Sequence, residues 1–376
     1  MQLPVLPTNP LPPLYATWMD QLLAGPIPAE TDATCSDCAM CSTEGGPQTR
    51  SELFYNPEVK CCTYIPTLPN YLVGRMLGDE DPNFVFGRKT VEERLRAGLA
   101  VTPLGLGMPP TFTFLYAQTA GRAFGLSKTL RCPHYLSEEG GRCGIWKHRA
   151  SVCATWYCKH VRGAVGAKFW ASLNQLLSAV EQSLSHWCVY ELEIEVEALS
   201  LLFPPRSVFK NDHQLDHRAL DGTVDPRMYE LLWGKWLGRE AEFYQEATRL
   251  VNGLDWKEIV SLGGTEIKVR ERLVRDAYSR LMSEELPPSL RVGSLNVLGM
   301  GQESCRVTTY SAIDPLDLPQ RLIAVLHYFD GRPTLDAMEA IEEHEGIKLD
   351  AALVRKLADF EILIPNESSS EKGGVN

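Results

Sequence analysis

The stretch CPHYLSEEGGRCGIWKHRASVCATWYC, residues 132–158, places four cysteines, Cys132, Cys143, Cys153 and Cys158, close together along the chain. Glycine and polar turn residues lie between them. Thiolates are soft ligands that suit zinc, copper(I) and iron–sulfur centres. Four of them in one short stretch predict a metal site that orders this part of the chain.

Five further cysteines precede this stretch, in a segment rich in turn residues, 35–69. Such a segment needs a metal or another staple to become ordered. A reduced cytosolic chain uses clustered cysteines for metal binding or catalysis more often than for disulfides. The five form the patterns Cys35-x2-Cys38-x2-Cys41 and Cys61-Cys62. The predicted metal ligands are therefore Cys35, Cys38, Cys41, Cys61, Cys62, Cys132, Cys143, Cys153 and Cys158.

The spacing favours an iron–sulfur cluster, of the 4Fe-4S type, over zinc. Zinc sites usually pair two Cys-x2-Cys units, whereas three cysteines at two-residue spacing are closer to ferredoxin-type loops. Nine cysteines could supply two four-thiolate centres with one left over. Zinc or another metal stays an open alternative. The remaining cysteines, Cys188 and Cys305, lie outside the cluster, and Cys188 falls in an apolar helical stripe that favours a buried side chain.

Charge is unevenly distributed along the chain. The net charge of −11 argues against a general nucleic-acid-binding protein, because phosphate binding needs a basic surface. The segment 121–170 is the exception, with nine Lys/Arg against two Glu. These cations would stabilise an anionic thiolate-ligated cluster, although a solvated basic face is the other interpretation.

Histidines near the cysteines could serve as ligands, proton donors or packing residues. Those within the cysteine stretch are His134, His148 and His160. A second set, Asp212, His213, Asp216 and His217, has an i,i+4 histidine spacing that can chelate a metal, but its polar surroundings favour a solvated surface.

The rest of the sequence predicts a mainly α protein. Apolar residues recur at steps of three and four over 168–192, which indicates a long helix, and further helices are expected near 14–24, 90–100, 226–285, 319–328, 334–345 and 350–360. Thr90 is the expected cap of the second of these. The predicted organisation is an extension (1–34), a metal-stapled cysteine domain ending in the long helix (35–192), a helical region (193–290), a small winged-helix-like α+β unit (291–365) and a disordered tail (366–376).

The cysteine pattern resembles the CxxCxxCC (YkgJ-type) cysteine-cluster family of zinc- or iron-chelating proteins, which includes a flagellin lysine methylase. The resemblance covers roughly residues 35–160 and is most specific in the stretch 132–158. The family's adjacent cysteine pair follows its second cysteine directly, whereas here Ser42 follows Cys41 and the pair comes at Cys61-Cys62. The resemblance implies a metal site but no single reaction.

The C-terminal part bears a weaker resemblance to PqqD-like winged-helix units that bind peptides in peptide-modifying systems. The resemblance rests on the segments HYFDGRPT at 327–334 and LVRKLADFEIL at 353–363. From Asp314 to Asn366 there are 11 acids and five bases, which favours a protein or peptide contact over nucleic acid. A generic winged helix without a peptide role is the competing interpretation.

Three functions therefore remain open: an iron–sulfur protein that modifies a peptide or protein or transfers electrons, a non-catalytic zinc-stapled interaction module, and a metal storage or delivery protein. Whether the chain is an enzyme is left undecided by the sequence. No nucleotide-binding glycine loop is found. We expect a cytoplasmic protein without a membrane span, because no apolar run is long enough and no signal peptide is recognisable.

Overall fold

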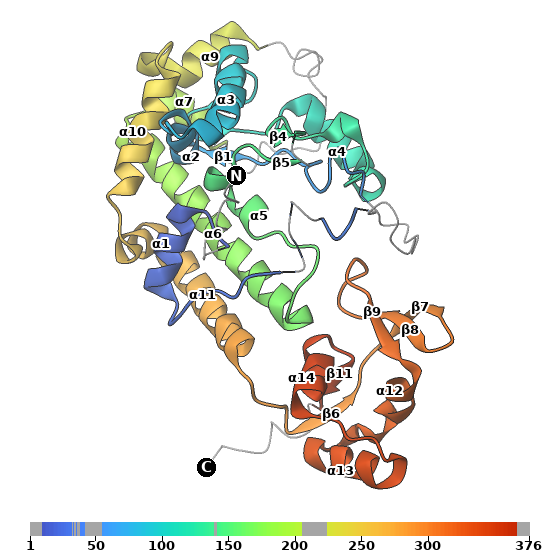
Figure 1. Ribbon diagram of the computed structural model, residues 1–376. Coiled ribbons are helices and arrows are strands. Elements are labelled where there is room, and N and C mark those ends of the chain that lie inside the picture. The colour runs from blue at the N-terminus through green and yellow to red at the C-terminus, as the bar shows by residue number, and fades with distance from the viewer. Residues whose placement is uncertain are drawn as a thin grey trace. The chain divides into compact units, whose positions relative to one another are not determined.

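The computed structural model describes residues 10–31, 33, 35, 38–41, 55–138, 141–204 and 224–366. The predicted tail, apart from Asn366, lies outside these residues, as do Asp212, His213, Asp216 and His217. The described chain is mainly α-helical with small antiparallel sheets, which confirms the predicted class at that level (Figure 1). None of its helices is both long enough and apolar enough to cross a membrane.

The chain divides into two compact units, each built from separate segments. The N-terminal unit comprises Met1–Ala29, Thr34–Trp156 and Leu173–Arg272, and the C-terminal unit comprises Glu30–Ala33, Tyr157–Ser172 and Leu273–Asn376. The division falls within two helices, α6 (Gly163–Glu191) and α11 (Trp256–Met282). The linear domain boundaries expected from the sequence stay predictions.

The N-terminal unit is built from short helices and strands. Its helices are α1 (Pro13–Leu22), α2 (Asn70–Leu77), α3 (Val85–Ala97), α4 (Pro110–Ala123), α5 (Ser151–Ala154), α7 (Val196–Leu202), α9 (Pro226–Trp233) and α10 (Glu240–Asn252). Its strands are β1 (Leu68–Pro69), β2 (Val101–Thr102), β3 (Gly105–Leu106), β4 (Tyr135–Leu136) and β5 (Arg142–Cys143), paired in the orders β1-β3-β2 and β4-β5.

Helices α2 and α10 pack with their backbones unusually close together. Gly74 of α2 makes this possible, since a Cβ atom there would lie 1.9 Å from the carbonyl oxygen of Tyr244. Thr248 of α10 donates its hydroxyl hydrogen to the carbonyl oxygen of Tyr71 at 2.7 Å and joins the two helices. This contact fixes α2, which ends just before Asp79.

Two sequence expectations for this unit need correction. The helix expected near residue 90 begins five residues earlier, at Val85. Thr90 is therefore not its cap but an internal residue whose hydroxyl bonds the carbonyl oxygen of Gly87 at 2.7 Å. In the region 226–285, the periodicity predicts a buried stripe that includes Met228, Leu231, Phe243 and Ala247; Phe243 and Ala247 are buried as predicted, whereas Met228 and Leu231 are exposed.

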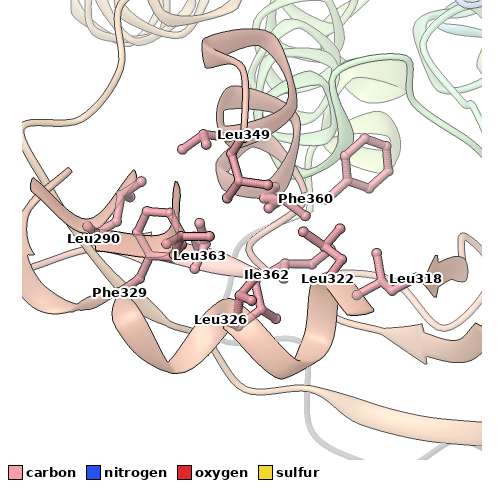
Figure 2. Close-up of a cluster of buried hydrophobic side chains, with 14 of the residues drawn as sticks. Leu290, Leu318, Leu322, Leu326, Phe329, Leu349, Phe360, Ile362 and Leu363 are labelled. Atoms are coloured by element: carbon pink, nitrogen blue, oxygen red, sulfur yellow. The ribbon is translucent and has the colours of Figure 1, made fainter. Parts of the chain in front are cut away.

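The described part of the C-terminal unit combines two three-stranded antiparallel sheets with short helices and with the adjoining ends of α6 and α11. The sheets have the orders β10-β6-β11 and β7-β8-β9. The elements are β6 (Ser289–Val292), β7 (Asn296–Met300), β8 (Ser304–Thr308), β9 (Leu316–Pro319), α12 (Gln320–Val325), β10 (Asp330–Pro333), α13 (Thr334–Glu345), α14 (Ala351–Asp359) and β11 (Leu363–Pro365). Figure 2 shows its core, where Leu290, Phe329, Phe360 and Leu363 converge with neighbouring leucines.

Candidate metal centre

The turn that carries Cys61 and Cys62 is held by backbone hydrogen bonds to Asn56. The amides of Val59 and Lys60 donate to the carbonyl oxygen of Asn56 at 3.0 and 2.8 Å. Lys60 adopts a left-handed conformation with φ of 50°, which turns the chain directly before the cysteine pair. The side chain of Lys60 is only 6% exposed, and its ammonium group donates to the carbonyl oxygens of Cys35 and of Gly141. One buried lysine thus connects three groups of cysteines. The first group is Cys35, Cys38 and Cys41, the second is Cys61 and Cys62, and the third is Cys132, Cys143, Cys153 and Cys158.

A short hairpin brings Cys143 back toward Cys132. Tyr135 of β4 pairs with Cys143 of β5, and the amide of Tyr135 donates to the carbonyl oxygen of Cys132 at 3.1 Å. The amide of Cys132 donates to the carbonyl oxygen of Cys62 at 2.8 Å. The second and third cysteine groups are therefore linked directly through the backbone, although 69 residues lie between Cys62 and Cys132 in the numbering.

Cys153 lies on the one-turn helix α5, whose start is held by a buried carboxylate. Glu181 of α6 accepts hydrogen bonds from the amide and the hydroxyl of Ser151, both at 2.6 Å, and from the hydroxyl of Tyr15. Burial raises the pKa of Glu181, while these hydrogen bonds oppose the shift. This network fixes the position of α5 and therefore of Cys153, which lies two residues after Ser151.

Electrostatic interactions show that eight of the nine predicted ligands share one neighbourhood. Each of these thiols interacts electrostatically with at least one other, and these interactions join all three groups. They are Cys35, Cys38, Cys41, Cys61, Cys62, Cys132, Cys143 and Cys153. The ninth, Cys158, belongs to the C-terminal unit.

Burial and crowding keep most of these thiols protonated. Burial is the main cause that raises the pKa of Cys35 to about 11 and of Cys132 to about 12, and neighbouring thiols add to both shifts. Cys61 is different, because the hydrogen bond from the Cys62 thiol lowers its pKa to about 7. So many thiolates could form together only if a cation compensated their charge.

Among the described residues, three positively charged side chains act on the ionisation of the thiols. Arg149 lies between Cys143 and Cys153 in the sequence and favours the ionised form of both, as well as that of Cys35 and Cys61. Lys60 acts in the same direction on Cys35, Cys41 and Cys61, and Arg94 on Cys132. The cations that act on the thiols are therefore Lys60, Arg94 and Arg149.

Three buried nitrogen atoms near the thiols have no hydrogen-bond partner in the described structure. They are Nη1 of Arg94, Nε2 of His134 and Nη2 of Arg149. A buried polar group without a partner costs about 1–3 kcal/mol, and more when it is charged. The two guanidinium nitrogens are donors and would suit an acceptor, such as the sulfur of an anionic centre. Nε2 of His134 differs, because Nδ1 donates to the Thr90 hydroxyl and the neutral ring leaves Nε2 as an acceptor.

The three histidines of the cysteine stretch have different surroundings. His134 is buried, its Nδ1 lies 2.7 Å from the hydroxyl of Thr90, and burial lowers its pKa to about 3, so its ring is neutral. His148 bonds Asp79 through Nε2 at 2.6 Å. His160 lies in the C-terminal unit, with Nδ1 3.3 Å from the hydroxyl of Tyr310.

The two cysteines left outside the cluster are buried in apolar cores. Cys188 is buried on α6, as predicted, and its thiol lies 3.8 Å from the carbonyl oxygen of Ala247. Cys305 belongs to the core of the C-terminal unit. The structure describes all eleven cysteines, and none is joined to another by a disulfide bond.

Sequence reasoning counted Arg149 within the basic stretch but did not distinguish it, and it missed Lys60, Arg94 and Glu181. For Lys60 and Arg149 the available signal was their nearness to the cysteines in the sequence. For Glu181 there was no signal, because its contact with Ser151 is made only by folding.

Within the described ranges, no three or more His, Cys, Asp or Glu side chains are arranged so that they could hold a metal ion. The thiols are thus gathered in one region without converging on one point.

No family model, curated protein or solved structure matches the chain.

Proposed function

We propose that this chain is a metal-binding protein whose N-terminal unit holds a cysteine-ligated iron–sulfur cluster, of the 4Fe-4S type. The observation that carries the proposal is the gathering of eight thiols from three separate segments into one electrostatic neighbourhood. Metal binding would bring selected sulfurs from this neighbourhood to coordination distance and offset the burial and mutual repulsion that disfavour their ionised forms.

The chemistry of the surroundings favours an iron–sulfur cluster over zinc. Zinc bound by four thiolates offers no sulfur atoms beyond those of its ligands. An iron–sulfur cluster adds inorganic sulfides, which accept hydrogen bonds from nearby N–H groups. Two guanidinium groups that each have a buried, unpartnered nitrogen, those of Arg94 and Arg149, suit such an acceptor.

The proposal is tested by purifying the protein without oxygen and measuring metal and sulfide. We expect a brown protein that absorbs near 400 nm and contains iron and sulfide in about 4:4 ratio per cluster. A colourless protein with stoichiometric zinc would refute the cluster and support the zinc-stapled interaction module. Metal that a mild chelator removes while the fold is retained would favour storage or delivery.

A pair of cysteine substitutions tests the location of the site. Cys153→Ala removes a thiol that interacts with those of Cys132 and Cys143, so we expect it to lower the metal content per chain. Cys188→Ala changes a buried cysteine that packs against α10 and should leave the metal content unchanged. Equal metal loss in both variants would contradict the proposed location. The same comparison with Cys158→Ala tests whether the ninth cysteine takes part.

The C-terminal unit is proposed to bind a peptide or protein that the cluster-containing unit modifies or reduces. The proposal rests on the PqqD-like resemblance and on the edge strand β7, where Val297, Leu298 and Met300 are exposed. In the described sheet, β7 has a neighbour on one side only, and an extended peptide can add to such an edge. The excess of acids over residues 314–366 of the same unit favours a basic peptide. The test is the binding of the protein to an array of basic apolar peptides. Binding by the wild type that is lost with Leu298→Pro would support this partner, whereas unchanged binding by the variant would refute the edge as the site.

A further inference from the structure

Arg149 is held in place from three sides. Its Nε donates to the carbonyl oxygen of Trp146 at 3.2 Å, and its Nη1 donates to the carbonyl oxygen of Cys153 at 3.1 Å. Its guanidinium group lies over the Trp146 ring, 3.4 Å from the ring centre. These contacts leave the side chain little freedom and fix the direction of its remaining nitrogen.

That remaining nitrogen, Nη2, is buried and has no partner among the described residues. The whole residue is 7% exposed, and no carboxylate is paired with its charge in the described structure. An arginine held so firmly, with a buried donor and no counter-charge, indicates that an anionic acceptor belongs beside it. The thiols of Cys35, Cys61, Cys143 and Cys153 are the groups on which its charge acts.

We propose that Arg149 donates a hydrogen bond through Nη2 to a sulfur of the bound cluster and thereby sets the reduction potential of the cluster. The inference rests on the proposed function and assigns a role within that site. Reduction adds one negative charge to the cluster, and a fixed cation with an N–H donor stabilises the reduced form more than the oxidised form. Arg149 is therefore a residue that tunes the cluster, not a ligand.

The neighbouring cations contribute differently. Arg94 gives one guanidinium nitrogen to the carbonyl oxygen of Gly107 at 2.6 Å, and among the thiols its charge affects Cys132. Lys60 bonds two carbonyl oxygens through its ammonium group. Arg149 alone, of these three, acts on cysteines from all three groups. It is thus the cation from which the largest effect on the cluster is expected.

The test is a redox titration of anaerobically purified protein, followed by absorbance near 400 nm. In Arg149→Gln we expect the midpoint potential to become more negative, so that the ratio of reduced to oxidised cluster at the wild-type midpoint falls about tenfold, which is ~59 mV for one electron. Arg149→Lys keeps the charge but loses the planar donor group, so a smaller shift in the same direction is expected. Arg122→Gln removes an exposed charge from the same basic segment and should leave the midpoint unchanged.

The outcomes separate the inference from the proposed function. Wild-type protein without iron and sulfide would overturn both. An iron–sulfur protein whose Arg149→Gln and Arg149→Lys variants keep the wild-type midpoint would overturn the inference and leave the cluster standing; it would mean that Nη2 meets internal water instead. If Arg149→Gln fails to accumulate folded protein, the midpoint of Arg149→Lys decides alone, because that variant preserves the charge.

Discussion

Asp79 shows how a single buried carboxylate can be kept ionised. It is 8% exposed, accepts from His148 Nε2 at 2.6 Å and from the amide of Asp81 at 3.0 Å, and pairs with Lys147 at 3.0 Å. Burial works to raise the pKa of Asp79, but these interactions outweigh it and lower the pKa to about 2. Burial also lowers the pKa of His148 despite the carboxylate, so the imidazole is neutral near pH 7 and Lys147 supplies the positive charge.

The stability of the protein should therefore depend on pH through Asp79. Its folded-state pKa lies below the unfolded value, so its contribution is full above about pH 4 and is lost as pH falls toward 2. We expect Asp79→Asn to lower the free energy of unfolding by about 2 kcal/mol at pH 7, and the difference from wild type to shrink at pH 2.5. Urea unfolding at both pH values measures it. Glu80→Gln, at the exposed neighbouring position, is the control. A difference independent of pH would contradict this account.

At the same scale, spacing along the chain singles out the candidate cysteines but not the residues around them. Cys35, Cys61 and Cys132 attract notice because they recur with other cysteines. Arg149 and Glu181 do not, because their importance comes from burial and from partners far away in the sequence. A single sequence contains residue types, whereas an unpartnered buried nitrogen exists only in the folded chain.

At the scale of elements, periodic helices were predictable and very short strands were not. The helix Thr334–Glu345 has the predicted bounds, and the helix around Phe169 and Val180 was predicted within five residues at its start. Strands β1 to β5 have two residues each, too few to show any alternation. Their pairing depends on contacts such as that of Tyr135 with Cys143, which the sequence does not reveal.

The close approach of α2 and α10 leads to a prediction about Gly74. A Cβ atom at this position would lie 1.9 Å from the Tyr244 carbonyl oxygen and 2.3 Å from the Thr248 hydroxyl, so one helix would have to move. We expect Gly74→Ala to destabilise the protein by about 2–3 kcal/mol. Gly121→Ala, on α4 with nothing within 4 Å, should instead stabilise slightly, by about 0.5 kcal/mol. Thermal or urea unfolding of the two variants provides the comparison, and equal effects would disprove the steric argument.

At the scale of the whole molecule, both units are assembled from segments that are distant in sequence. The C-terminal unit includes Tyr157–Ser172, and Arg162 of that segment bonds the buried carboxylate of Asp359 at 2.8 Å and the carbonyl oxygen of Ser283 at 3.1 Å. Long-range pairs of this kind leave no periodic pattern. They arise because a buried carboxylate needs a partner, and the fold supplies one from elsewhere in the chain.

The two units should respond differently to metal removal. The C-terminal unit has its own apolar core around Phe329, Ile341 and Leu363, in which the cysteine is a packing residue, Cys305. The segments that carry the proposed ligands in the N-terminal unit contain mostly turns, a one-turn helix and two-residue strands, so their order should depend on the metal.

Hydrogen–deuterium exchange with and without a chelator tests this difference. After metal removal we expect faster exchange in peptides covering residues 55–62 and 132–154, with unchanged exchange in strands β6 and β11, whose amides are protected by pairing within the C-terminal unit. Cys188→Ala protein treated in the same way is the matched control and should behave like the wild type. Uniform acceleration in both units would mean that the metal supports the whole chain, and no change in either would mean that the cysteine segments are ordered by packing alone.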